Sequence, residues 1–74
     1  WKENVERLSV DSSNLRSVGW NPGTGILEVE FHSGSVYEYY DVPEEVYGEL
    51  LEASSKGGYF HRNIRKTFSF KQVS

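Results

Sequence analysis

The chain has 74 residues, a net charge of −3 and neither cysteine nor methionine. This length allows one small domain, and the lack of cysteine excludes disulfides, thiolate metal sites and a cysteine nucleophile. No apolar run approaches the ~20 residues of a membrane span and no signal-peptide pattern is present, so we expect a cytoplasmic protein that does not enter a membrane. Because the sequence starts at Trp1 and not at methionine, we also expect a part or a trimmed form of a longer chain.

Three strands are predicted in the first half of the chain. Residues 1–11 are mainly polar, and we interpret them as a linker or appended segment in front of a domain spanning 12–74. The strands are expected over 15–21, 26–32 and 35–42. The second is the clearest, because apolar and polar residues alternate through ILEVEFH. Short turns rich in Gly, Asn and Ser join the three into an antiparallel meander.

The second half predicts a helix, a helical turn and a last strand. The helix is expected over 43–58, because a proline and two glutamates open it and a Gly-Gly pair follows its apolar stripe. A short helical turn over 59–65 and a strand over 67–73 follow. The predicted class is α+β: a meander of about three strands plus a C-terminal strand, packed against one helix and a short second helical turn.

The register of the second hairpin decides where Tyr37 and Tyr39 point. They are two residues apart and share one face of their strand. A three-residue loop would pair Val29 with Tyr37 and Leu27 with Tyr39, and would turn both rings into the core. A two-residue loop would turn the rings outward and bury Glu38, which is costly for an unpaired carboxylate. We therefore favour the three-residue loop, with Tyr37 and Tyr39 mainly structural.

The order of these motifs resembles the KTSC domain family. The stretches that carry the resemblance are DSSNLRSVGWNPGTGILEVEF, FHSGSVYEYYDVPEEVYGELLEASSKGGYFHRNIR and TFSF. Within them, the Tyr-x-Tyr pair of the family falls on Tyr37 and Tyr39, and its helix start falls on Val42-Pro43. Its Ala-x-Ser-x-Gly segment falls on Ala53, Ser55 and Gly57. Together they cover about residues 11–71. The resemblance implies a small module that occurs at the C-terminus of some lysyl-tRNA synthetases and also as a stand-alone bacterial protein, with RNA binding as its conjectured role.

The residues predict neither an enzyme nor a metal or cofactor site. His32 and His61 lie in different segments and in no metal-ligand spacing. The serines fall in turns and caps without a paired base and acid, so none is a candidate nucleophile. We expect a non-catalytic accessory domain without a cofactor.

Charge is divided unequally along the chain. Residues 1–52 hold all eleven acidic residues and three basic ones, whereas 53–74 hold five basic residues and no acidic one. Basic and aromatic residues alternate in KGGYFHRNIRK, a composition that suits RNA or single-stranded nucleic acid, including tRNA. The residues that we expect to bind it are Tyr59, Arg62, Arg65, Lys66 and Lys71, on one connected basic edge.

Two other interpretations of these charges stay open. The basic residues are also explained as partners of the acidic half within one fold, or as solvated side chains, which the negative net charge and the pI of about 5.3 favour. The acidic strand face around Glu28, Glu30, Glu38 and Tyr40 predicts a different function, the binding of a protein partner or of the rest of a larger host chain. A nucleic-acid site would show a steep dependence of binding on salt, which separates it from the protein-binding alternative.

Overall fold

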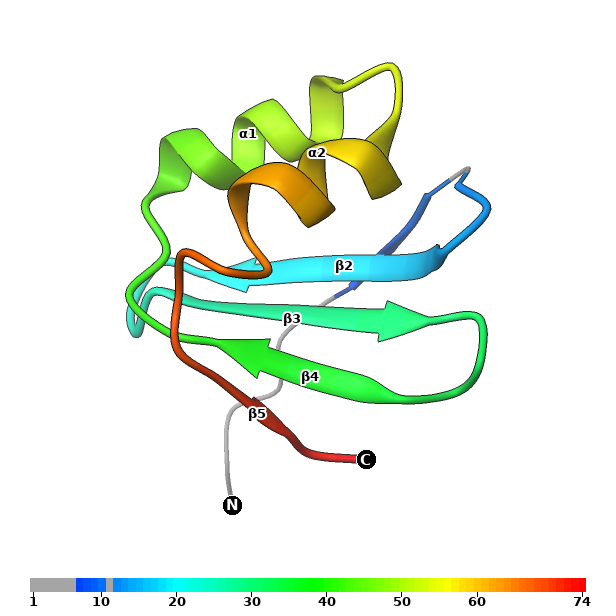
Figure 1. Cartoon of the computed structure of the whole chain (residues 1–74). Coiled ribbons are helices and arrows are strands. Elements are labelled where there is room, and N and C mark those ends of the chain that lie inside the picture. Colours follow the sequence, from blue (N-terminus) through cyan, green and yellow to red (C-terminus); the bar gives the residue numbers. More distant parts are fainter. Residues whose placement is uncertain (1–6, 11) are drawn as a thin grey trace.

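One antiparallel sheet carries two helices on one of its faces (Figure 1). The structure is a computed structural model that describes residues 7–10 and 12–74. Its five strands lie in the order β1-β2-β3-β4-β5, and the predicted α+β class is confirmed. In chain order the elements are β1 (Leu8–Ser9), β2 (Leu15–Asn21), β3 (Ile26–Phe31), β4 (Val36–Tyr39), α1 (Glu44–Glu52), α2 (Lys56–Asn63) and β5 (Phe70–Gln72).

The segment that precedes the predicted domain contributes an edge strand. β1 pairs with β2, and Leu8 lies opposite Val18. This strand has two residues only, and Leu8 is half exposed. Residues 1–6 and 11, which make up most of the predicted linker, lie outside the described residues.

The register between β3 and β4 agrees with the three-residue loop. Leu27 lies opposite Tyr39, and Val29 lies opposite Tyr37. Gly34 in the loop has a φ of 98°, a left-handed conformation that glycine adopts without steric cost. Both tyrosines therefore lie on the helix side of the sheet, as predicted.

A bulge in β2 brings two large side chains to the same face. The register shifts between Leu15 and Ser17, so that Leu15 lies opposite Phe31 while Val18 lies opposite Val29. Residues three apart point to opposite faces of a regular strand, and the extra residue of the bulge corrects this parity. Leu15 and Val18 are both fully buried, together with Leu27, Val29, Leu50 and Ile64.

The segment expected to form one long helix and a turn forms two helices instead. α1 ends at Glu52 and the chain is extended at Ala53. α2 then starts behind Ser55, whose hydroxyl accepts a hydrogen bond from the Gly58 N–H at 3.2 Å. A serine N-cap of this kind satisfies one of the free N–H groups of the first turn.

The Gly-Gly pair therefore opens α2, and the predicted helix stop at this pair was wrong. The N-cap outweighs the poor helix propensity of glycine. Gly57 also lets α2 approach the chain before β2 closely, since a Cβ there would lie 3.3 Å from Asn14 Nδ2. The start of α2 is thereby held near the end of the sheet where β2 begins.

The last strand is shorter than predicted. β5 spans Phe70–Gln72 and pairs with β4, with Phe70 opposite Tyr39. Phe68 precedes the strand and packs against the core, whereas Phe70 is 54% exposed. An exposed phenylalanine on the helix side of the sheet shows that the helices leave part of this face uncovered.

Candidate functional site

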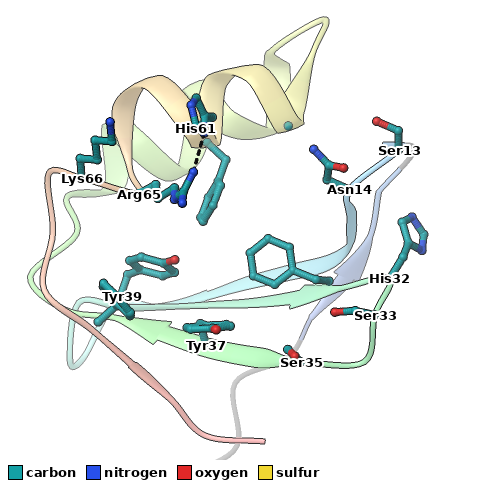
Figure 2. Close-up of a pocket in the computed structure, with 14 residues that line it drawn as sticks. Ser13, Asn14, His32, Ser33, Ser35, Tyr37, Tyr39, His61, Arg65 and Lys66 are labelled. Carbon is teal, nitrogen blue, oxygen red and sulfur yellow. Dashed lines mark hydrogen bonds between the residues drawn. The ribbon is translucent and has the colours of Figure 1, made fainter.

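A groove of about 780 Å³ lies between α2 and the uncovered part of the sheet (Figure 2). Its floor is formed by aromatic side chains of three neighbouring strands: Phe31 from β3, Tyr37 and Tyr39 from β4, and Phe70 from β5. Phe60 lines it from α2. The alternation of the strands places these rings together, because each belongs to the inward-facing set of its own strand.

The rings contact one another edge to face or at a tilt. The centroid of Phe60 lies 5.5 Å from that of Phe31 and 5.3 Å from that of Tyr39, both nearly perpendicular. Phe70 lies 5.8 Å from Tyr37 and 5.5 Å from Tyr39. These are favourable geometries for aromatic pairs, so the floor holds its shape while part of its ring surface faces solvent.

Of the two tyrosines on the floor of the groove, Tyr39 is the more buried. The residue is 3% exposed, yet it lines the groove. Burial raises the pKa of Tyr39 to about 12; the neighbouring Tyr37 adds to the rise, and the positive charge of Arg65 opposes it. The phenol is therefore neutral around pH 7, and it lies within electrostatic reach of Arg65.

Basic side chains form the rim of the groove above this floor. His61, Arg65 and Lys66 line it from α2 and from the turn that follows α2, and all three are exposed. Arg65 Nη1 donates a hydrogen bond to His61 Nδ1 at 3.1 Å, and Figure 2 shows both side chains above the rings. The backbone N–H of Arg65 donates to the Phe60 carbonyl at 3.0 Å, which ties the rim to α2.

The rim cations have no acidic partner in the described part of the chain. Ion pairs there join Arg7 to Glu28 at 3.1 Å and to Glu30 at 3.7 Å, and involve neither Arg65 nor Lys66. The interpretation in which the basic C-terminal segment pairs with the acidic half therefore finds no support at the rim. Arg65 and Lys66 are available to an anion.

The predicted binding residues do not lie together on one edge. Arg65 and Lys66 line the groove, whereas Tyr59 and Arg62 do not. The Tyr59 hydroxyl donates to Glu49 Oε1 at 2.6 Å and so holds α2 to α1. Burial, and then this hydrogen bond, raise the pKa of Tyr59 to about 12.

Lys71 lies on the opposite face of the sheet. It is paired with Glu38 across β4 and β5, and Glu38 is paired with Glu28 across β3 and β4. Directly paired residues share a face, so Lys71 belongs to the outer, acidic face. The expected single edge of four basic residues is thus divided between two sides of the molecule.

The carboxylates of the acidic strand face have partners within the fold. Arg7 lies against Glu28 and Glu30, and the Ser17 hydroxyl donates to Glu30 Oε1 at 2.9 Å. The Tyr40 hydroxyl donates to Glu38 at 3.2 Å. These contacts give the acidic side chains partners inside the fold.

Other kinds of site find no support in the residues that the structure covers. Over 7–10 and 12–74 no cluster of His, Asp and Glu is arranged to hold a metal ion. Nor does any helix in these ranges combine the length and the apolar character needed to cross a membrane. His32, the other histidine that lines the groove, lies at its far end, with its Nε2 2.8 Å from the Ser12 carbonyl oxygen (Figure 2).

Known proteins similar to this chain include a protein of similar length and a much longer ligase. An uncharacterized protein of Stutzerimonas stutzeri (strain A1501) is 50% identical over 58 residues, which cover 78% of this chain and 82% of that protein. A lysine–tRNA ligase of Nostoc sp. (strain PCC 7120) is 43% identical over 67 residues, which cover 90% of this chain but 12% of the ligase. The chain therefore corresponds to a small part of the ligase.

The fold has a close counterpart among solved structures. The crystal structure of a KTSC domain protein from Yersinia pestis superposes with a TM-score of 0.90 at 32% identity, covering 96% of this chain and all of that one. The family model described as KTSC domain matches residues 11–68. The chain belongs to the KTSC domain family.

Proposed function

We propose that this domain is a non-catalytic module that binds single-stranded RNA in the groove. Unpaired bases stack on exposed aromatic rings, and phosphates need basic side chains within reach of the stack. The observation that carries the proposal is the position of Arg65 and Lys66, which have no carboxylate partner in the ranges described and stand on the rim of an aromatic groove. Tyr37 and Phe70 offer the ring surface, since Tyr37 is half-buried and Phe70 is 54% exposed.

The negative net charge does not conflict with this site. Glu28 and Glu38 lie on the face of the sheet opposite the groove, as the strand register requires. The residues that line the groove include Arg65, Lys66 and both histidines of the sequence, and no acidic residue. The local charge at the groove, not the net charge of the domain, acts on a bound phosphate within a Debye length of about 8–10 Å.

The similarity to lysine–tRNA ligases supports RNA as the ligand class. These ligases act on tRNA, and the matching region is 12% of the Nostoc enzyme. A small module attached to such an enzyme would add RNA contacts to those of the catalytic part. The same similarity supports a cytoplasmic location and a place within a larger host chain for this module.

Protein binding through the acidic face is the weaker candidate. A docking face gains most from charges that lack partners in the free protein. Here Glu28 and Glu30 are engaged by Arg7, and Glu38 by Tyr40. The rim of the groove, in contrast, holds cations that no described acid neutralises.

A salt titration tests the proposed function. Fluorescence anisotropy with a labelled single-stranded RNA of roughly ten nucleotides is expected to show binding at micromolar protein in low salt, with log K falling linearly with log salt. Replacing Arg65 or Lys66 with alanine should make the slope shallower by about 0.7 for each phosphate that the variant no longer neutralises. Replacing Lys71 with alanine is the matched control and should leave the slope unchanged. Absence of binding in low salt would overturn the proposal.

A further inference from the structure

We propose that the Tyr39 hydroxyl and the Arg65 guanidinium read the edge of a base in the groove and select keto bases, uracil and guanine, over amino bases. This inference rests on the proposed function and adds a specificity to the same site. It starts from the position of one hydroxyl group. Tyr39 is 3% exposed, its ring is fixed between Phe60 and Phe70, and it lines the groove.

The Tyr39 hydroxyl has no hydrogen-bond partner among the residues that the structure describes. The hydroxyls of Tyr37, Tyr40 and Tyr59 donate to Gln72, Glu38 and Glu49, whereas that of Tyr47, like that of Tyr39, has no such partner there. Of these two unpartnered hydroxyls, the one of Tyr39 belongs to a residue that lines the groove. The hydroxyl is not among the buried polar atoms that lack a partner, so it faces the open groove, where water can pair with it. A ligand in the groove can take the place of that water. A phenylalanine would keep the ring and remove this polar contact.

Both polar groups at this place present donors to a ligand. A guanidinium has hydrogen-bond donors only, and one N–H of Arg65 already donates to His61 Nδ1. The phenol of Tyr39 is neutral and can also donate its proton. Figure 2 shows the Arg65 head group above the Tyr39 ring. An acceptor of a ligand between them can take a hydrogen bond from each group, whereas the guanidinium repels an amino group.

A base edge matches this place better than a phosphate. Tyr39 belongs to the floor among Phe60 and Phe70, where a fully charged phosphate would lose its hydration. The exposed Lys66 on the rim suits the phosphate instead. On the C4–C5 edge of a pyrimidine, uracil offers the O4 acceptor and cytosine a donating amino group, and guanine offers O6 and N7 on the corresponding edge. The acceptors O2 and N3 of cytosine lie outside this edge. Donors that meet this edge therefore favour the keto bases.

Tyr39→Phe tests the inference with little change of shape. Anisotropy is measured with two labelled RNAs of roughly ten nucleotides, one of uridine only and one of cytidine only, which differ at the O4 or N4 position. The wild-type protein is expected to bind the uridine strand about three- to tenfold more tightly, the effect of one well-placed hydrogen bond. The phenylalanine variant should lose this preference, keep its affinity for cytidine, and melt at the same or a higher temperature.

Each other outcome contradicts the inference in a recognisable way. Equal weakening on both strands would mean that the hydroxyl contacts phosphate or sugar. An unchanged preference for uridine would mean that the Tyr39 hydroxyl does not contact the base. A clearly lower melting temperature of the variant would mean that the hydroxyl stabilises the fold. In these cases the proposed RNA binding stands, since it rests on Arg65 and Lys66. If the wild-type protein binds neither strand, both the function and the specificity are overturned.

Discussion

Replacing Tyr39 with alanine is expected to lower the free energy of unfolding by about 3–5 kcal/mol, as for other large buried aromatic side chains. The ring is 3% exposed and contacts Phe60 and Phe70 at centroid distances of 5.3 and 5.5 Å. A chain of 74 residues has a thin core, so this loss would approach its whole stability. Urea denaturation followed by circular dichroism measures the change.

Tyr40 provides the matched control for this substitution. It is the next residue along the chain, and its side chain contacts Glu38 on the outer face. Tyr40→Ala is expected to cost about 1 kcal/mol or less, as for most substitutions away from a core. A loss below about 1 kcal/mol for Tyr39→Ala, or equal losses for both variants, would contradict the inward register of the second hairpin.

Reversing the two rim charges is expected to abolish nucleic-acid binding at moderate salt. In the double variant Arg65→Glu, Lys66→Glu, two attractive interactions with phosphate become repulsive, and like-charge juxtaposition costs several kcal/mol. We expect affinity for a single-stranded RNA to fall by on the order of a hundredfold. Anisotropy measures the fall, and circular dichroism verifies that the variant is folded.

A second double variant controls for net charge. Arg62→Glu, Lys71→Glu changes the net charge by the same amount, but neither residue lines the groove. Arg62 is exposed on α2, and Lys71 lies opposite Glu38 on the outer face. This variant is expected to bind within a few-fold of wild type. If its binding fell as strongly as that of the groove variant, a diffuse basic edge would explain the affinity better than the groove.

Strand parity explains why much of the sheet could be predicted. The cost of burying Glu38 favoured the three-residue loop, and Val29 is indeed opposite Tyr37. The bulge in β2 was not predictable in the same way. Leu15 and Val18 have no common face in a regular strand, and only the packed sheet shows the parity change between them.

The helical part was harder because local and tertiary effects compete there. A Gly-Gly pair usually ends a helix, and this expectation ignored Ser55 three residues before Gly58. The serine offers an N-cap, and Gly57 allows close approach to Asn14, more than forty residues away along the chain. No pattern in the sequence around Gly57 indicates that it lies close to Asn14.

The candidate site was predicted in part. Arg65 and Lys66 were identified from composition, but the rings below them come from three strands and meet only once α2 is placed over the sheet. The position of Lys71 could have been deduced. Phe70 and Lys71 are consecutive residues of the predicted last strand, and consecutive residues of a strand face opposite ways.

Nuclear magnetic resonance can show whether single-stranded RNA binds in the groove. The backbone amide shifts of the labelled domain are recorded while an unlabelled uridine strand is added at low salt. We expect the largest shifts to cluster around the groove, at Tyr37, Tyr39, Arg65, Lys66 and Phe70. Shifts that cluster instead on the outer face, at Glu28, Glu38 and Lys71, would contradict it, as would a titration in which the amides of the groove do not move.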